Sequence, residues 1–401
     1  MNGPLSGVKI VDLSSVVMGP FATQILADLG ADVIKVESPE GDTMRNIGPS
    51  RTKGMAPNYL NMNRNKRSIV LDLRRSEALA ALKRLIVDAD VFFSNLRPAA
   101  MERLGLGYAE VARINSRVIY AMATGFGESG RYAGKPAFDD LIQGAVAIPS
   151  LMQSTTGTPQ YLPTNMCDRV TGLTAVYAVT SALFARERSG RGQAVEIPMM
   201  ETMAQFVLSD HMFGATFEPP LGEPGYSRLL VKGRAPFKTR DGYVCALVYL
   251  DKHWNKFCDI IGHPAGAADP RFANTRTRTE NVDAFNAFIA EQMAKRTSAE
   301  WMDIFTEADL PIMPMHTVAT LLDDPHLNDV KFFSWMEHPT EGRIRSMGIP
   351  TAFSDTPATV RRHAPLLGEN TREILQQAGF SSDEIGQLIE SGAASDAQNL
   401  T

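Results

Sequence analysis

Residues 7–37, GVKIVDLSSVVMGPFATQILADLGADVIKVE, decide the fold. The apolar run 7–13 predicts a buried strand, and Pro20 marks the start of a helix, where a missing N–H is tolerated. Gly30 predicts the end of that helix, and Asp32–Glu37 predicts the next strand. A strand, a helix and a second strand in this order are typical of a βαβ unit, in which the strands are parallel.

Outward from this unit, strand and helix signals keep alternating. Further strands are predicted at 68–73, 90–96, 117–123 and 194–198. Helices are predicted at 76–87, after Asp168 as far as Gly190, and over the Met-rich stretch 199–213, which we assign to the core. This alternation predicts the α/β class, with a parallel sheet covered by helices on both faces.

The composition changes near residue 217 and predicts a boundary. Residues 217–228, FEPPLGEPGYSR, contain three prolines and two glycines, which is typical of a linker. The sequence beyond it predicts a hairpin around Arg240-Asp241-Gly242 and a helix opened by a capping box from Thr297 to Glu300. A second, smaller α+β domain is therefore expected here, and the polar tail 393–401 is expected to fray.

The composition excludes several classes of protein. The 401 residues include 40 Lys+Arg and 45 Asp+Glu, a net charge of −5, which does not favour a nucleic-acid partner. Three cysteines without a CxxC motif predict neither a disulfide scaffold nor a metal site. The uncharged stretch between Arg169 and Arg186 has 16 residues, short of the roughly 20 that span a bilayer. We expect no membrane partner and a cytoplasmic location.

Three common site motifs are missing. The first βα turn lacks GxGxxG, and neither GxxxxGK[ST] nor GxSxG occurs in the chain. The first histidine is His211, so the N-terminal half holds no histidine for acid or base catalysis. The usual dinucleotide, P-loop and α/β-hydrolase sites are therefore not predicted.

Basic residues gather near the ends of predicted strands. The cluster NRNKRS (63–68) precedes one strand, and Arg74, Asn95 and Arg97 follow the ends of two. In an open α/β sheet, ligands bind beyond the carboxyl ends of the strands. The pattern favours a phosphate-bearing ligand held by arginine and lysine, and solvated surface charge explains it equally well.

Asp168 stands where a strongly apolar helix begins. It is either the N-cap of that helix or a carboxylate nucleophile, kept ionised by the helix dipole and nearby N–H donors. Gly172, one turn later, leaves room for a ligand or for a closely packed helix. Asp139 opens another predicted helix, where a cap is the default interpretation. Cys167 has no visible histidine partner and is predicted to be a buried structural residue.

At these residues the sequence resembles the family III CoA-transferases, which include formyl-CoA transferase, carnitine CoA-transferase and the bile-acid-inducible proteins, with α-methylacyl-CoA racemase as a relative. Each matching segment is weak alone, and their shared order and spacing are specific. The segments are 5–37, 60–73, 89–108, 115–143, CDRVTG (167–172), 188–202, 237–244, 324–333 and 363–375.

The resemblance implies a fold and an assembly. It implies a Rossmann-like large CoA-binding domain built from both ends of the chain, with a small domain between, and two chains interlocked in an obligate homodimer. On this basis we predict a large domain from 1–216 and 321–401, a linker at 217–232 and the small domain at 233–320.

The resemblance also implies site residues and a reaction. Asp168 matches the family's catalytic aspartate and Asp139 a second acid beside it. Coenzyme A would be a co-substrate, with no metal. The positions that match CoA contacts are Val17, Met18, Leu71, Arg74, Asn95, Leu96, Arg97, Arg103, Lys135, Ala137 and Phe138. The expected reaction moves CoA from an acyl-CoA to a carboxylic acid through an aspartyl mixed anhydride and an aspartyl-CoA thioester.

The sequence departs from particular branches of the family. Val17 and Ser38 replace a glutamine and an arginine of formyl-CoA transferases, which makes oxalate–formate exchange doubtful. Phe138 replaces a histidine of the racemases, which weighs against the alternative of an acyl-CoA racemase or isomerase with Asp168 as proton carrier. A CoA-binding protein without activity is a third hypothesis. Arg45, Arg51 and Lys53 either hold a second carboxylate of the acceptor acid or are surface charge.

Overall fold

The computed structural model describes residues 3–231 and 233–397 and divides into two compact units. Unit 1 comprises the chain up to Val146, Pro163–Gln205 and the chain from His326 onward, and unit 2 comprises Ala147–Leu162 and Phe206–Pro325. Helix α9 (Met199–His211) runs across the division. The domain boundaries expected from the sequence stay a prediction, and residue 232 of the predicted linker lies outside the described residues.

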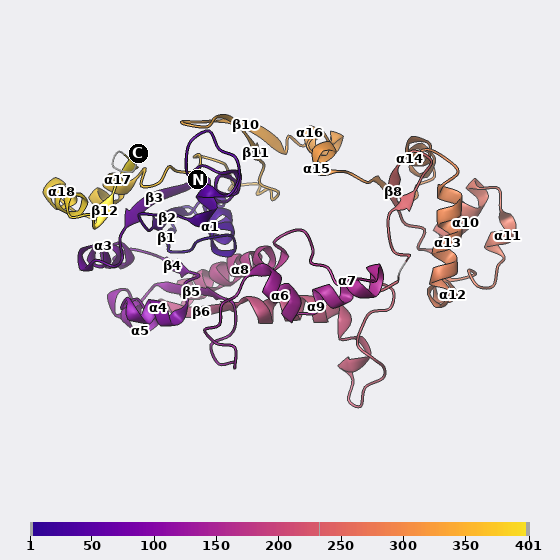
Figure 1. Cartoon of the computed structure of the whole chain (residues 1–401), viewed down its shortest axis with the longest axis horizontal. Coiled ribbons are helices and arrows are strands. Elements are labelled where there is room, and N and C mark those ends of the chain that lie inside the picture. Colours follow the sequence, from indigo (N-terminus) through magenta and orange to yellow (C-terminus); the bar gives the residue numbers. More distant parts are fainter. Residues whose placement is uncertain (1–2, 232, 398–401) are drawn as a thin grey trace. The chain divides into compact units, whose positions relative to one another are not determined.

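A seven-stranded sheet forms the centre of unit 1 (Figure 1). Its strands are β1 (Lys9–Asp12), β2 (Asp32–Glu37), β3 (Lys66–Leu71), β4 (Val91–Ser94), β5 (Ile119–Thr124), β6 (Gln193–Pro198) and β12 (Ala394–Ser395). They lie in the order β12-β3-β2-β1-β4-β5-β6, and each neighbouring pair is parallel except β12 with β3. The order β3-β2-β1-β4-β5-β6 is that of the doubly wound Rossmann fold, so the predicted α/β class is confirmed.

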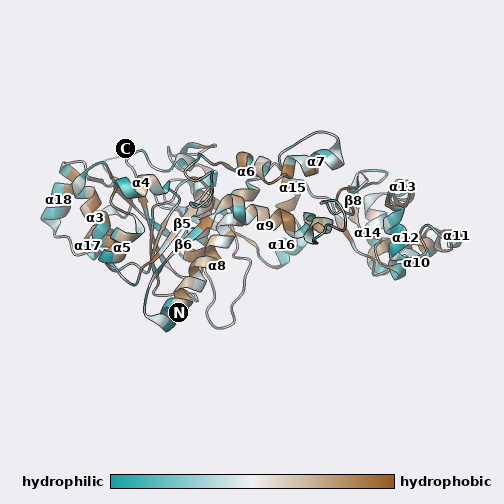
Figure 2. Ribbon diagram, turned by 90° about the horizontal axis from the view of Figure 1, so that it is seen from below, coloured by the Kyte–Doolittle hydropathy of each residue, from teal (hydrophilic) through white to brown (hydrophobic). Residues whose placement is uncertain are grey.

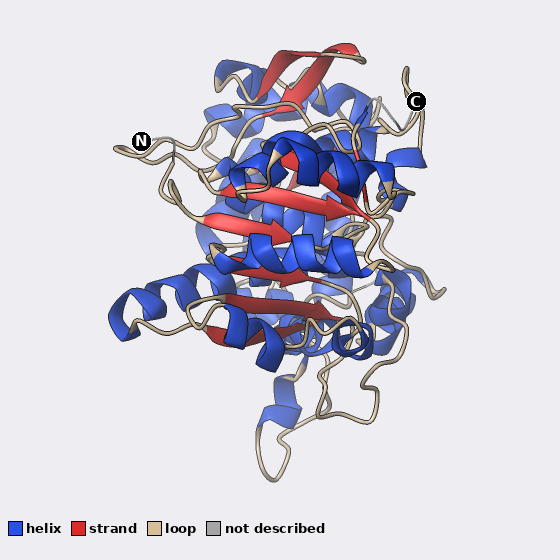
Figure 3. Cartoon of the chain, turned by 90° about the vertical axis from the view of Figure 1, so that its left-hand side faces the viewer, coloured by secondary structure: helices blue, strands red, loops and turns tan. Residues whose placement is uncertain are grey.

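Helices cover both faces of this sheet, as Figure 3 shows. They are α1 (Met18–Asp28), α2 (Pro57–Asn63), α3 (Ser76–Val87), α4 (Pro98–Arg103), α5 (Tyr108–Ile114), α6 (Asp139–Ala145), α8 (Met166–Ser189), α17 (Thr371–Gln377) and α18 (Ser382–Glu390), with the 3-10 turn η1 (Thr43–Asn46). The apolar face of α3 packs with α5, α17 and α18 onto the strands and forms a hydrophobic core of the unit. Gly190, at φ +72°, ends α8 in the left-handed conformation that favours glycine.

Two strands differ from the prediction. β3 begins at Lys66 rather than at residue 68, because the side chains of Lys66 and Arg67 are buried in ion pairs and do not interrupt the strand. The polar tail, predicted to fray, forms the edge strand β12, which pairs antiparallel with β3. The last residues of that tail, 398–401, lie outside the described residues.

The Met-rich helix α9 is only partly a core element. Met199, Met203 and Val207 are buried on one side of the helix, as predicted. Phe206 and Leu208 are exposed, because consecutive residues of a helix point in different directions. The assignment of the whole stretch to the core was therefore wrong for this second face.

Unit 2 contains a three-stranded antiparallel sheet, β7 (Phe237–Lys238), β8 (Tyr243–Ala246) and β9 (Ile312–Pro314), in that order. Its helices are α7 (Ile148–Thr156), α10 (Asp251–Ile260), α11 (Pro264–Ala267), α12 (Thr275–Glu280), α13 (Val282–Met293), α14 (Ser298–Glu307) and α15 (Val318–Leu321), with the 3-10 turn η2 (Phe213–Thr216). The predicted hairpin is confirmed. So is the capping box, in which Thr297 and Glu300 each accept the other's backbone N–H.

The chain returns from unit 2 to unit 1 through the short helix α16 (Pro325–Asp329) and a two-stranded hairpin, β10 (Phe333–His338) with β11 (Gly342–Met347). The C-terminal helices and β12, yellow in Figure 1, then complete the sheet that the N-terminal strands began. Both ends of the described chain therefore contribute to unit 1.

Candidate active site

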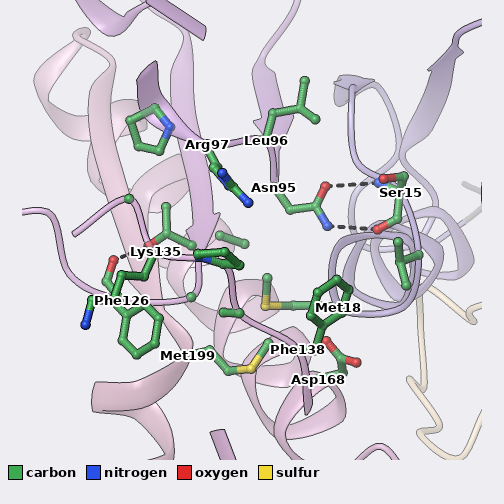
Figure 4. Close-up of a pocket in the computed structure, with 18 of the residues that line it drawn as sticks. Ser15, Met18, Asn95, Leu96, Arg97, Phe126, Lys135, Phe138, Asp168 and Met199 are labelled. Atoms are coloured by element: carbon green, nitrogen blue, oxygen red, sulfur yellow. Dashed lines mark hydrogen bonds between the residues drawn. The ribbon is translucent and has the colours of Figure 1, made fainter. Parts of the chain in front are cut away.

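The carboxyl ends of β1, β4 and β5 open onto a cavity of about 290 Å³ (Figure 4). All its lining residues belong to unit 1. The predicted site residues among them are Val17, Met18, Asn95, Leu96, Arg97, Lys135, Ala137, Phe138 and Asp168. The sheet thus brings together residues that are up to 151 positions apart in the sequence (168 − 17).

The loop after β1 forms one wall of this cavity, and Asn95 fixes it to the end of β4. The Asn95 amide accepts the N–H of Ser15 at 3.0 Å and donates to the carbonyl oxygen of Ser15 at 2.8 Å. Figure 4 shows this pair of hydrogen bonds as dashed lines. Asn95 was predicted to touch CoA, and in the structure its amide holds the wall.

A buried ion pair supports the same loop from the side of β2. Lys35 and Asp42 are fully buried and lie 2.9 Å apart. Lys35 also donates to the carbonyl oxygen of Ser14 at 2.9 Å, and Asp42 accepts the N–H of Val16 at 3.2 Å. Val16 has φ +72°, which a β-branched residue rarely adopts, so these contacts hold a conformation that the chain alone would avoid.

Asp168 lies in the first turn of α8, and Figure 4 shows it beside Met18 and Phe138. It is the third residue of the helix, because α8 begins at Met166, so the N-cap interpretation was wrong. The side chain is half-buried, and no hydrogen bond to its carboxylate is present among the described residues. The Asp168 carboxylate can therefore accept a ligand or react.

The Asp139 side chain is hydrogen-bonded to the backbone of Asp168. The Asp139 carboxylate accepts the N–H of Asp168 at 3.0 Å and a hydrogen bond from the amide of Gln143 at 2.6 Å. Asp139 therefore satisfies a free donor of α8 and does not cap α6, its own helix.

The pKa of Asp168 differs from the expectation. Burial, and then the negative charge of Asp139, raise the pKa of Asp168 to about 7, and Arg169 only partly opposes them. The sequence predicted a carboxylate kept ionised by the helix dipole. Burial and the neighbouring acid both act against that prediction, because each disfavours the charged form.

Gly172 serves helix packing. A Cβ atom at this position would lie 3.0 Å from the carbonyl oxygen of Met18 and 2.9 Å from the ring of Phe21. The close approach of α1 to α8 therefore requires glycine and fixes Met18 next to the turn that carries Asp168. Cys167 is buried, and its pKa is raised to about 12 by burial and the nearby acids, as expected for a structural thiol.

A second cavity of about 450 Å³ lies at the carboxyl ends of β2 and β3. Leu71, Arg74 and Ser38 line it, and it shares Ser15 and Leu96 with the first cavity. The two cavities are therefore adjacent along the same edge of the sheet, at the point where the strand order reverses on either side of β1.

The family model for "CoA-transferase family III" matches residues 5–371 of this chain. The chain belongs to CoA-transferase family III. It is an enzyme that transfers CoA between an acyl-CoA and a carboxylate, and the hypothesis of a binding protein without activity falls.

Individual relatives of this family III CoA-transferase agree. The human succinyl-CoA:glutarate CoA-transferase is 30% identical over 97% of this chain and 89% of its own. A formyl-CoA:oxalate CoA-transferase of Bradyrhizobium is 32% identical over 98% of each chain. The crystal structure of a CAIB/BAIF family protein from Brucella suis superposes with a TM-score of 0.81 at 30% identity, over 94% of this chain and all of that one.

The basic cluster 63–68 of the transferase lines neither of the two cavities at the carboxyl ends of the strands. Arg64 pairs with Asp28 at 2.7 Å and Lys66 with Asp12 at 3.3 Å, and all four side chains are at most one-tenth exposed. Arg64 and Lys66 lie at the amino end of β3, and the Lys66 side chain reaches Asp12, the last residue of β1. These ion pairs already neutralise Arg64 and Lys66, so the phosphate-binding interpretation of this cluster gains no support from the structure.

Two other predicted cations also lie elsewhere. Arg45 is buried and pairs with Glu37 at 2.7 Å, so it is not available to an acceptor acid. Arg103, at the end of α4, is exposed and lines neither cavity. The sequence analysis did not identify Asp42 and Lys35. A signal for them was present, because Lys35 is a charged residue inside a predicted buried strand.

Across 3–231 and 233–397, no three His, Cys, Asp or Glu side chains gather as a metal site would require. Within the same ranges, none of the helices combines the length and apolarity needed to cross a membrane.

Proposed function

We propose that this enzyme moves CoA from an acyl-CoA donor to a carboxylic acid acceptor, with Asp168 as the residue that carries the covalent intermediates. The observation that supports this is the Asp168 carboxylate itself. It is half-buried, has no protein hydrogen-bond partner in the described chain, and faces a cavity at the ligand edge of the sheet.

The reaction needs no net input of energy. An oxygen of Asp168 attacks the thioester carbonyl, the C–S bond breaks, and CoA leaves as its thiolate to give a mixed anhydride. The thiolate attacks the aspartyl carbonyl, so the donor acid leaves and an aspartyl-CoA thioester remains. The acceptor carboxylate then attacks this thioester, and the same two steps run in reverse and restore Asp168.

The two adjacent cavities suit the two ends of CoA. We assign the phosphate-bearing adenosine to the larger cavity, beside Leu71 and Arg74, and the pantetheine arm to the path past Leu96 toward Asp168. Arg74 has an exposed side chain that donates to Asp72 from Nε at 2.7 Å and from Nη2 at 3.1 Å. Its Nη2 also lies 3.7 Å from Glu40, so Nη1 is the nitrogen that remains open to a phosphate. Arg97 and Lys135 line the first cavity and supply further positive charge.

The racemase alternative gains no support. Racemisation needs an acid and a base on opposite faces of the α-carbon. Phe138, which precedes Asp139 and is 66% exposed at the cavity, cannot exchange a proton. We therefore keep CoA transfer as the single proposed reaction.

We also propose that two chains associate, in the interlocked homodimer that the resemblance implies. α8 exposes Leu173, Tyr177 and Phe184 to more than half of their full areas, and α9 exposes Phe206. Figure 2 shows hydrophobic ribbon along these helices. A surface of this kind is typical of one covered by another chain.

The three cysteines, which are thiols in the structure, fit the expected cytoplasmic location.

The substitution Asp168→Asn tests the proposal, because the amide cannot form the anhydride. We expect transfer to fall by at least about a thousandfold, with unchanged thermal unfolding and CoA affinity. Asp140→Asn, which changes an exposed acid nearby, is the matched control and keeps activity. Incubation with acyl-CoA alone, followed by mass spectrometry, should show a CoA adduct at Asp168. Normal turnover in a fresh, undeamidated Asp168→Asn sample would refute the proposal.

A further inference from the structure

Unit 2 contains a cavity of its own, of about 120 Å³. It lies between the β7–β8 hairpin, the helices α12 and α13, and the segment that precedes β7. All its lining residues belong to unit 2, and none lines the cavities at the sheet of unit 1. It is therefore a separate feature from the Asp168 cavity.

The charge of this cavity is positive. Arg228, Arg234 and Arg278 line it, and no aspartate or glutamate does. Arg278 is buried and already neutralised, because its guanidinium donates to Asp251 and to the carbonyl oxygens of Phe272 and Tyr249. The other two arginines have no carboxylate partner in the described chain.

Arg228 is held in place without being neutralised. Its guanidinium lies 3.9 Å from the centre of the Tyr249 ring, a cation–π contact that orients the group and leaves its N–H edges free. Arg234 makes no ion pair or side-chain hydrogen bond in the described chain and is exposed where it lines the cavity. Two unpaired guanidinium groups at one small cavity repel each other unless an anion lies between them.

Most of the remaining wall is apolar, and Thr275 and Thr279 add two hydroxyls to it. Val248, Phe285 and Ile289 belong to the hydrophobic core of the unit, and Phe237 packs against it. Asn286 adds one neutral amide. Ligand sites are typically concave and apolar with a few convergent polar groups, and this cavity has that composition.

We propose that this cavity binds a small dicarboxylic acid, with its two carboxylates at Arg228 and Arg234 and its methylene chain against Val248 and Phe285. A guanidinium binds a carboxylate through two parallel hydrogen bonds. The apolar wall favours an acid with a carbon chain over inorganic phosphate. The volume, enough for a few water-sized groups, suits an acid of this size and not CoA.

Isothermal titration of the full-length protein with glutarate, in the absence of CoA, tests the binding. We expect saturable binding that Arg228→Gln and Arg234→Gln each weaken by about tenfold and that the double variant abolishes. Arg276→Gln is the matched control. It changes an arginine of α12 that is 83% exposed and does not line the cavity, and its Kd should equal that of the unchanged protein.

Two further titrations make the result specific. Butyrate, with one carboxylate, and inorganic phosphate should each bind at least about tenfold more weakly than glutarate. Binding that is absent, unaffected by the double variant, or as tight for phosphate would overturn the proposal. Asp168→Asn protein should bind glutarate normally, so failure of the proposed reaction and failure of this site are distinguishable.

Steady-state kinetics then tell which acid uses the site. If the acid is the acceptor in turnover, Arg228→Gln and Arg234→Gln raise the KM for glutarate with little change in kcat, and Arg276→Gln does not. If it is a free metabolite bound apart from the reaction, the titration changes and the KM does not. Both outcomes are consistent with the binding site, and they distinguish whether its ligand is the acceptor acid or a separate metabolite.

Discussion

Positively charged side chains have different environments at the two ends of strand β3. At its start, Lys66 and Arg67 are buried and matched by Asp12 and Asp32. Beyond its end, Arg74 keeps a side chain that is 74% exposed at the edge of a cavity. The same kind of residue holds the fold at one end of a parallel strand and remains available to a ligand at the other. Position along the strand, rather than charge density in the sequence, separates the two roles.

Buried acids show the same contrast. Burial alone would raise the pKa of Asp12, but Lys66 and Lys35 outweigh it and hold that pKa below its usual value. Asp168 is half-buried beside an acid instead of two lysines, and its pKa rises to about 7. A carboxylate whose charge is compensated is structural, whereas one left uncompensated at a cavity is a candidate for chemistry.

The strongest test of this contrast is the pair Lys66→Met and Arg74→Met. Lys66→Met leaves Asp12 buried without its nearest cation, and we expect the free energy of unfolding to fall by about 3–5 kcal/mol. Arg74→Met should leave the urea midpoint unchanged, since that side chain is exposed. Equal midpoints for the two variants would break the comparison.

The pH dependence of transfer tests the charge of Asp168. The carboxylate is the nucleophile, so its protonation below a pKa of about 7 should lower kcat/KM by about tenfold per pH unit, with a plateau above pH 8. Asp139→Asn removes the adjacent negative charge, which should move the profile to lower pH, while the amide oxygen still accepts the N–H of Asp168. A profile that stays in place would show that Asp139 does not act on Asp168 by charge.

Arg97→Ala tests whether the cations at the ligand edge serve CoA. We expect the KM for acyl-CoA to rise by about tenfold, with an unchanged melting temperature, because Arg97 lines the cavity and makes no ion pair in the described chain. Arg103→Ala, outside both cavities, should have the smaller effect. An equal rise in KM for Arg103→Ala would support the CoA contact that the resemblance implies at Arg103. It would also contradict the expectation that only cations lining the cavities bind CoA.

The smallest expected effect belongs to Ser38→Arg. Ser38 lines the second cavity where formyl-CoA transferases carry an arginine. An added guanidinium there should lower the KM for acyl-CoA by about two- to fivefold, the gain of an exposed ion pair. The same measurement with a 3′-dephospho-CoA thioester is the control and should show no gain. A lower KM with both thioesters would mean that the added guanidinium does not bind the 3′-phosphate of CoA.

The sequence predicts the local elements well and the distant pairings poorly. β2 and α3 have the predicted bounds, Asp32–Glu37 and Ser76–Val87, because apolar periodicity and Gly30 are local signals. The cavity contains most predicted site residues, because ligands of parallel sheets gather at the carboxyl ends of strands.

What could not be predicted depends on partners far away in the chain. The partner of Lys66 lies 54 positions earlier, so the cluster 63–68 looked like a ligand site. The pKa of Asp168 depends on Asp139, 29 positions earlier, whose carboxylate the fold turns toward it. No signal in the polar tail showed that it would find an open edge at β3.

That late edge strand has a consequence for biosynthesis. β3 is made early by the ribosome, and its outer hydrogen-bonding groups have no permanent partner until Asn370, Thr371 and β12 have been synthesised. All of unit 2 is translated in the interval. The nascent protein therefore presents an open strand to its surroundings for most of its synthesis, and this stage is where chaperones would find it and where aggregation would begin.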